Sequence, residues 1–367
     1  MISLTPTSEQ QMLIDAVRRY SAEVVRPAAH DADESGAFPD RVVQTGWELG
    51  ILPGSIPESL GGFAETYSAV TGVLAYEELA YGDLALALRL MAPALVAVPL
   101  VLAGTDAQRE QMMDLFLGET PPPVTAALLE PAIAFDPLHP ATTATRDGDG
   151  CYVLNGKKAY VPLAEGADTI LVYAWNADAG QVDGFFVDGG ADGLTTGSRE
   201  KLMGIRALPT CTLTLENVRV DPAQRLGGEA GIDFGRILAH SRVALAALAV
   251  GVMRAALDYA ITYAKERVQF GVPIATKQAI AFMLADCAIE IDSARLMAWE
   301  AAWKLDQGQA GGKEAYLAKE YAAKAALMVT DSAVQTLGGH GYIREHPVER
   351  WLRNARGFAA FEGLAIV

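Results

Sequence analysis

The sequence predicts an α+β protein in three parts: an N-terminal helical domain (1–120), a middle antiparallel β-barrel or sandwich domain (121–228) and a C-terminal helical bundle of four-helix type (229–367). Two observations predict this order. Apolar residues recur at helical spacing near both ends, and short β-prone runs separated by turn signals fill the middle. Because helices and strands are segregated and do not alternate, a βαβ protein is not indicated.

The N-terminal part is predicted to be several helices of ordinary length. Breaks at 38–39, 52–54 and 61–62 contain proline or glycine and divide the helical pattern. The most apolar stretch, 84–103, contains an arginine and two prolines, so a buried hairpin or kinked helix is favoured over a membrane span. Three consecutive prolines at 121–123 then end the helical part.

The middle part is predicted to form strands joined by tight turns. The β-prone runs are 151–154, 169–173, 185–187 and 211–215. Asp147–Gly150 and Asn155–Gly156 supply residues that tolerate positive φ, as tight hairpins require. After residue 231 the helical period returns, with helices expected at 233–267, 276–307 and 312–338.

Composition excludes several classes of protein. The 45 acidic residues against 29 basic ones give a formal charge of −16, which argues against a nucleic acid as partner. The three cysteines are far apart without a C-x-x-C pair, so a disulfide framework is not indicated and a reducing, cytoplasmic setting is expected. The first six residues show no secretory signal, and the histidine spacing indicates no metal site.

Two arginines of the long predicted helix are candidate functional residues. Arg242 lies in an apolar run, where an unpaired guanidinium is costly, so it needs a carboxylate, a carbonyl or a ligand. A buried ion pair explains it as well as a functional role does. Arg267 lies 25 residues further, about 37 Å along a continuous helix, so the two cannot serve one compact site on one chain. Its position at a helix end also suits the helix dipole.

Glu362 is the third candidate, because it lies in an almost wholly apolar stretch from Phe358 to Val367. Desolvation raises the proton affinity of a carboxylate, which suits a general base working near neutral pH. Gly363 allows a ligand to approach the backbone closely. The alternative is an ordinary exposed glutamate.

Several motifs then occur in a characteristic order. In the C-terminal half they are Tyr263–Ile274, Gln278, Leu284–Cys287, Ala333–Tyr342, Pro347–Arg350 and Phe361–Gly363. In the β segment they are Asn155–Lys158, Met203–Arg206 and Val218–Val220. With these motifs the chain resembles the acyl-CoA dehydrogenase family over nearly its whole length, although as a divergent member.

The resemblance implies a subunit, usually of a tetramer, that binds FAD and forms a 2,3-double bond in an acyl-CoA thioester. Glu362 matches the base that removes the α-proton while the β-hydride leaves for the flavin. Arg242 matches the arginine at the substrate side. The implied substrate-binding residues are Phe135, Arg242, Phe361 and Gly363.

The resemblance also implies where the cofactor and the partners bind. The implied FAD-binding residues are Leu128, Leu129, Tyr160, Pro162, Arg267, Gln269, Phe270, Gln278, Gln335, Gly338 and Gly339. The stretch from Arg267 to Phe270 matches one that reaches the FAD of a neighbouring subunit, so a dimer of dimers is expected, from one kind of chain or two. An electron-transfer flavoprotein is the expected electron acceptor.

The chain departs from the family pattern at flavin and thioester contacts. Leu129, Pro162 and Leu364 stand where the family has threonine, and Phe135 stands where it has serine. A lost hydrogen bond costs about 1 kcal/mol and an unpaired polar atom about 1–3 kcal/mol, so weakened FAD binding is expected. Two alternatives therefore stay open: a non-catalytic or structural subunit of a mixed assembly, and a flavin oxidase or monooxygenase acting on a substrate that is not a CoA thioester.

Overall fold

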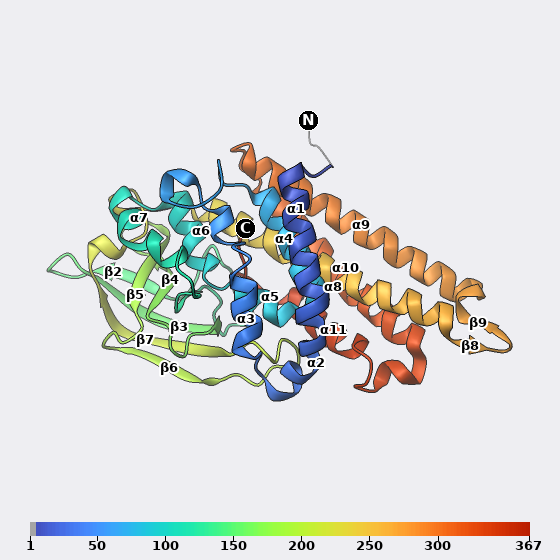
Figure 1. Ribbon diagram of the computed structural model, residues 1–367. Helices are drawn as coiled ribbons and strands as arrows, with labels where there is room; N and C mark the ends of the chain where they lie inside the picture. The colour runs from blue at the N-terminus through green and yellow to red at the C-terminus, as the bar shows by residue number, and fades with distance from the viewer. Residues whose placement is uncertain (1–4) are drawn as a thin grey trace.

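The computed structural model describes residues 5–367 and confirms the predicted order of helices, β domain and helices (Figure 1). The first four residues, on which the expectation of no secretory signal partly depends, lie outside the described residues. In Figure 1 the sheet lies at one end of the molecule and a small hairpin, β8 (Val268–Gln269) with β9 (Val272–Pro273), projects at the other. Long helices span the distance between them.

The N-terminal part consists of short helices. They are α1 (Ser8–Tyr20), α2 (Arg26–Ser35), α3 (Asp40–Trp47), α4 (Ala69–Gly82), α5 (Leu84–Leu90), α6 (Ala94–Ala103) and α7 (Asp106–Met112). The axes of α5 and α6 are bent by 50° relative to each other, and Pro93 lies in the short break between the two helices. The prolines in this stretch predict such a bend. Both helices are largely buried.

The β domain is a seven-stranded sheet. Its strands are β1 (Val124–Ala127), β2 (Thr143–Arg146), β3 (Tyr152–Pro162), β4 (Thr169–Asn176), β5 (Gln181–Asp188), β6 (Leu194–Arg199) and β7 (Thr210–Val220). Their order is β1-β4-β2-β3-β7-β6, with β5 paired along β4. The pairs β1–β4 and β2–β4 are parallel, so the sheet is mixed and not antiparallel as expected. These pairs are joined by long segments that contain other strands, and only such connections allow parallel pairing.

The two predicted turns have different outcomes. Asp147–Gly150 joins β2 to β3 as an antiparallel hairpin, as predicted. Asn155–Gly156 is not a turn: both residues lie inside β3, where the pairing with β7 shifts register. Gly156 has φ of +154°, and a Cβ there would lie 2.5 Å from the Thr142 hydroxyl. The glycine therefore serves a β-bulge and a close approach of two strands.

The C-terminal part is built on α8 (Phe234–Glu266), α9 (Gln278–Asp306), α10 (Gly312–Leu337) and α11 (Val348–Ala355). The first three agree with the predicted ranges to within two residues. α8 packs against α4, α9 and α10, so the N-terminal and C-terminal helices share one apolar core. Glu77 on α4 extends this junction through ion pairs with Arg254 on α8 (2.8 Å) and Arg295 on α9 (2.9 Å).

By length and composition α8 resembles a membrane-spanning helix. However, 78% of its most apolar 18-residue stretch is buried inside the protein. The apolar composition of α8 is therefore accounted for by its place at the centre of the helical core.

His240 on α8 is buried, and its Nδ1 donates to the main-chain oxygen of Val367. Burial lowers the pKa of His240 from 6.5 to about 4, and the hydrogen bond opposes this only in part. Between these pH values the unfolded chain binds a proton that the folded chain does not. We expect this residue to make the free energy of unfolding fall by about 3 kcal/mol as the pH drops through that range.

Urea denaturation at neutral pH and near pH 4 checks this expectation. His240→Gln should show a smaller loss between the two pH values than the unchanged protein. His30→Gln is the matched control, because His30 is exposed and its side chain has no hydrogen-bond or ion-pair partner among the described residues. An equal loss in all three proteins would show that His240 does not govern the acid sensitivity.

Candidate active site

Glu362 and Arg242 form an ion pair with each other. The Arg242 Nη2 and Nε atoms each lie 3.2 Å from Glu362 Oε1, and the two side chains are only 15% and 12% exposed. Of the partners that the sequence left open for Arg242, the structure therefore shows the carboxylate. The expectation of an apolar setting for Glu362 is wrong in one respect, since cationic groups lie beside the carboxylate.

Two further residues, which the sequence analysis missed, complete this cluster. Lys319 on α10 places its Nζ atom 3.6 Å from Glu362 Oε1 and 3.2 Å from Glu320 Oε1. The Arg242 guanidinium also lies 5.1 Å from the ring of Tyr316. Lys319 could have been found, because it lies four residues after Ala315 on the buried face of a helical pattern.

The loop that carries Glu362 is fixed by packing. Phe361 is buried and meets Phe358 edge-on, with ring centroids 5.7 Å apart. A Cβ on Gly357 would lie 2.1 Å from the Phe361 ring, so only glycine fits there. Gly363 has φ of +69°, and a Cβ on it would lie 2.7 Å from the Leu128 side chain. The Glu362 loop is thus held directly against the segment that follows β1.

That segment, Leu128–Glu130, is anchored by a buried lysine that the sequence analysis did not single out. Lys158 Nζ donates to Glu130 Oε1 (2.8 Å) and to the Leu128 carbonyl (3.1 Å). Burial lowers the pKa of Lys158 to about 8, while Glu130 acts in the opposite direction. Burial alone would raise the pKa of Glu130, but Lys158 and hydrogen bonding from Thr142, including its main-chain N–H, outweigh burial and lower that pKa.

The other predicted residues of the β domain lie around this segment. Leu128 and Leu129 are buried, whereas Tyr160 is 37% exposed and has φ of +54°. The Pro162 carbonyl accepts a hydrogen bond from the Thr125 hydroxyl (2.6 Å). Phe135 is half-buried and packs on the helical core. The structure therefore brings Leu128 directly to the Glu362 loop and leaves the Tyr160 ring accessible.

The remaining predicted cofactor residues lie far from Glu362, at the hairpin end of the molecule (Figure 1). All of them are exposed, and Phe270 at the tip is 94% exposed. These residues are Arg267, Gln269, Phe270, Gln278, Gln335, Gly338 and Gly339. Because α8 is continuous between Arg242 and Glu266, one chain does not place both ends of this helix in one site.

The hairpin end fits the pyrophosphate of a dinucleotide such as FAD. Within residues 5–367 the Arg267 guanidinium has no hydrogen-bond or ion-pair partner. α9 begins at Gln278 without a side-chain cap, and a Cβ on Gly338 or Gly339 would meet no atom within 4 Å. A free cation, unpaired N–H groups at a helix start and open backbone are the features that hold a phosphate group. The side chains at Leu129 and Pro162 carry no hydroxyl, and the nearby Thr125 hydroxyl already donates to the Pro162 carbonyl. The Tyr160 ring and main-chain groups are therefore what this region offers to a flavin ring.

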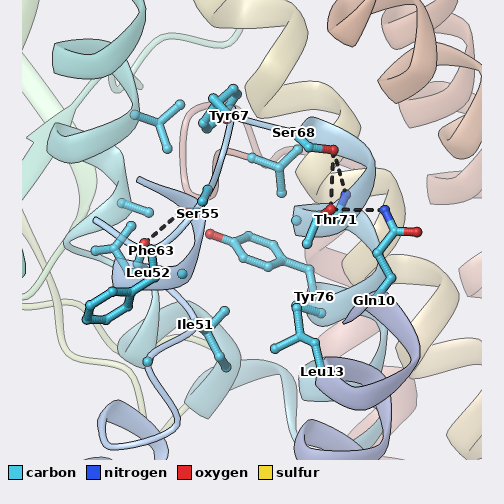
Figure 2. Close-up of a pocket in the computed structure, with 18 of the residues that line it drawn as sticks. Gln10, Leu13, Ile51, Leu52, Ser55, Phe63, Tyr67, Ser68, Thr71 and Tyr76 are labelled. Atoms are coloured by element: carbon cyan, nitrogen blue, oxygen red, sulfur yellow. Dashed lines mark hydrogen bonds between the residues drawn. The ribbon is translucent and has the colours of Figure 1, made fainter. Parts of the chain in front are cut away.

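A surface pocket of about 540 Å³ lies among the N-terminal helices (Figure 2). None of the predicted site residues lines it. Figure 2 shows Tyr67 and Tyr76 facing this space from opposite sides, with Leu52 and Phe63 at one edge. Ile366 and Val367 form part of the inner wall.

Comparison with known proteins assigns all three parts of the chain to one family. Three domain models match consecutive parts of the chain: "Acyl-CoA dehydrogenase, N-terminal domain" at 7–117, "middle domain" at 125–218 and "C-terminal domain" at 234–365. The butyryl-CoA dehydrogenase of Megasphaera elsdenii has a similar structure, with a TM-score of 0.88 and 32% identity over 98% of this chain and 96% of that one.

Curated relatives of known sequence span the chain as well. The mitochondrial short-chain specific acyl-CoA dehydrogenase of Bos taurus is 36% identical over 96% of this chain and 86% of its own length. Subunit CarC of the caffeyl-CoA reductase-Etf complex of Acetobacterium woodii is 35% identical over 98% of this chain and 96% of its own length. The chain therefore belongs to the acyl-CoA dehydrogenase family, a family of oxidoreductases that act on CH–CH groups.

Proposed function

We propose that the protein uses Glu362 to take the α-proton of an acyl-CoA thioester, so that a 2,3-double bond forms. The ion pair of Glu362 with Arg242, enclosed between α8, α10 and Leu128, is the observation that supports this role. FAD, when bound, supplies the acceptor for the β-hydride. All other steps are assigned to side chains and main-chain groups of this protein.

The surroundings of Glu362 are suited to holding a substrate. Arg242 and Lys319 orient the carboxylate. The main-chain N–H of Glu362 has no hydrogen-bond acceptor within the part of the chain that the structure describes. It is therefore free to donate to the thioester carbonyl, where negative charge develops as the proton leaves.

We infer that FAD binds where two copies of the chain meet. Each copy would supply Leu128, Leu129, Tyr160 and Pro162 to one cofactor and its hairpin end to another. The exposed apolar residues of α9 support an interface, because Phe282, Ile289 and Leu296 recur every seven residues and are 48–62% exposed. We propose a dimer of dimers as the assembly. If the assembly contains a second kind of chain, that chain would bind at the same apolar face of α9.

Removal of the Arg267 side chain tests this cofactor site. Arg267→Ala should lower the amount of FAD retained after gel filtration, and should weaken FAD binding about tenfold, since one charge-assisted hydrogen bond is lost. Arg41→Ala is the matched control, because Arg41 is exposed on α3 and has no partner among the described residues. Equal FAD retention in the two variants would contradict the assignment.

We further propose that an electron-transfer flavoprotein accepts the electrons, since the related CarC is a subunit of a caffeyl-CoA reductase-Etf complex. We also propose that the protein acts on CoA thioesters in fatty acid metabolism. We propose that it is located in the cytoplasm and has no membrane span. The buried state of α8 supports the last point.

One experiment separates this function from its two alternatives. The purified protein, tested for a flavin absorption spectrum, should be yellow, and anaerobic addition of butyryl-CoA should bleach it. Protein that lacks flavin and gains none from added FAD would favour a non-catalytic subunit of a mixed assembly, to which the lost hydroxyls at Leu129 and Pro162 point. Flavin that acyl-CoA thioesters do not bleach would favour an oxidase or monooxygenase, to which Phe135 points.

A further inference from the structure

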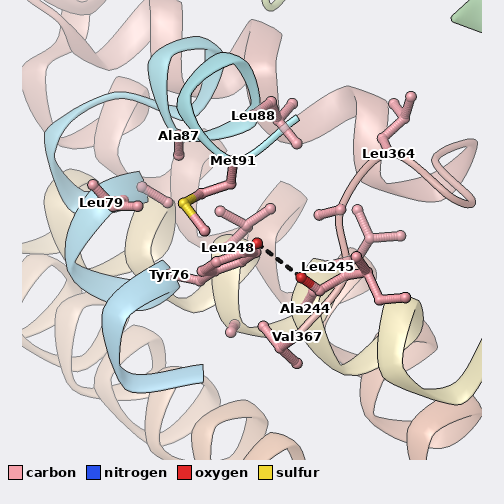
Figure 3. Packing of buried hydrophobic residues seen from close by; sticks show 14 of the residues in the cluster. Tyr76, Leu79, Ala87, Leu88, Met91, Ala244, Leu245, Leu248, Leu364 and Val367 are labelled. Atoms are coloured by element: carbon pink, nitrogen blue, oxygen red, sulfur yellow. Dashed lines mark hydrogen bonds between the residues drawn. The ribbon is translucent and has the colours of Figure 1, made fainter. Parts of the chain in front are cut away.

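The segment Leu364–Val367, which follows Glu362 and Gly363, is buried in the protein although it forms no helix or strand. Each of its four side chains is 2–4% exposed. Figure 3 shows Val367 between α4 and α8, beside Tyr76 and Ala244, and Leu364 nearer to Leu88 and Leu245. The segment thus occupies the core directly behind the carboxylate.

This segment separates two spaces. On one side is an internal cavity of about 20 Å³, lined by Gly363, Ala365 and Ile366 together with Ser241 and mostly apolar residues of α6, α8 and the sheet. On the other side is the surface pocket of about 540 Å³, lined by Ile366, Val367, Tyr67 and Tyr76 (Figure 2). Ile366 lines both, so the segment is the wall between them.

The internal cavity has no room for a long acyl chain as it stands. A volume of about 20 Å³ is room for about one water molecule. It is nevertheless the apolar space next to the Glu362 loop, since Leu95, Leu128 and Phe234 line it. An acyl chain whose α-carbon lies at Glu362 needs this space, and the segment fills the rest of it.

Few polar contacts hold the segment in place. The Tyr76 hydroxyl donates to the Ile366 carbonyl (2.8 Å), and His240 donates to the main-chain oxygen of Val367. The Val367 N–H donates to the His240 carbonyl over a long distance of 3.5 Å. The contact with α4 depends on Gly72, because a Cβ there would lie 2.8 Å from the Val367 Cβ. On either side, the Tyr67 hydroxyl, His240 Nε2 and Ser241 Oγ are buried without a hydrogen-bond partner among residues 5–367. Such unpaired groups reduce the stability of the packed arrangement.

We propose that Leu364–Val367, together with Gly72 and Tyr76 that hold it, determines which acyl groups reach Glu362. With the segment in place only the shortest acyl groups fit. When it is displaced, the internal cavity joins the surface pocket into one channel from Gly363 to Tyr67, which accepts a longer chain. This inference rests on the proposed function and adds the specificity of the same site.

Gly72→Ala tests the proposal without a change in the segment or in Glu362. The three atoms nearest to the added methyl group would all belong to Val367, at 2.8–3.5 Å, and alanine favours the helix that contains it. We expect hydrogen exchange of the main-chain amides of residues 364–367 to accelerate tenfold or more. We also expect octanoyl-CoA to bind at least fivefold more tightly, measured by calorimetry, with a smaller change for butyryl-CoA.

Two further variants complete the design. Tyr76→Phe keeps the ring but removes the hydrogen bond to Ile366, and should change exchange and octanoyl-CoA binding in the same direction. Gly312→Ala, at the first residue of α10 where a Cβ meets no atom within 4 Å, should change neither. The proposal would be overturned if hydrogen exchange were unchanged in both test variants. It would also be overturned if exchange were faster but octanoyl-CoA did not bind more tightly. The proposed function would stay intact in either case as long as butyryl-CoA is still oxidised. If neither thioester binds to any variant, the proposed function itself fails. Hydrogen exchange is measured without thioester, so it still shows whether the segment is displaced in each variant.

Discussion

Replacement of Glu362 by glutamine is expected to slow acyl-CoA-dependent reduction of bound FAD by about 10²- to 10⁴-fold, the contribution of a positioned general base. The amide has nearly the same shape and can still accept a hydrogen bond from Arg242, but it cannot take up the α-proton. Fold and FAD content should therefore stay unchanged. Stopped-flow absorbance of the flavin after anaerobic mixing with butyryl-CoA measures the rate.

Glu320→Gln is the matched control for this experiment. Glu320 also contacts Lys319, at 3.2 Å, but belongs to α10 and not to the loop beside Leu128. Its variant should reduce flavin at nearly the rate of the unchanged protein. Should Glu362→Gln retain that rate as well, the base must be another residue.

Replacement of Lys158 by methionine is expected to lower the free energy of unfolding by about 3–5 kcal/mol. The Lys158 side chain is fully buried, and its loss leaves the Glu130 carboxylate, 5% exposed, with main-chain N–H donors alone. Desolvation of an unpaired charge is the physical reason for the large effect. Urea denaturation at neutral pH measures it.

The double variant Lys158→Met with Glu130→Gln separates charge from packing. With no charge left in the site, most of the lost stability should return. A loss below about 1 kcal/mol in the single variant, or an equal loss in both, would mean that the ion pair does not stabilise the segment Leu128–Glu130. FAD content of the two variants shows in addition whether this anchor matters for the cofactor.

The long helices were predictable and the strand contacts were not. The range 233–267 agrees with Phe234–Glu266 because an apolar period repeated over some thirty residues outweighs any local exception. The prediction of a tight turn at Asn155–Gly156 was wrong because a dipeptide carries no information about the segment that packs beside it. Only the approach of Thr142 makes Gly156 part of a bulge and not of a turn.

The sequence indicates which residues belong to the candidate site better than it indicates which of them contact each other. Sequence chemistry required a partner for Arg242, but Glu362 is 120 residues away, and only the fold pairs them. Lys158 is an ordinary lysine in its local pattern, and the apolar helix face that carries Lys319 indicates burial but no partner. Their burial beside carboxylates follows from how α10 and β3 pack, which the sequence does not express locally.

The shared helical core has a consequence for how this chain can be recombined. Glu77 binds arginines of α8 and α9, and α4 lies along α8 over much of its length, so neither helical part has a complete apolar interior without the other. A chimera that takes its first 120 residues from a relative must therefore match the α8 surface of this chain, or both parts fail to fold. The boundary between helices and sheet is a place where secondary structure changes, and it is not a joint at which modules can be exchanged.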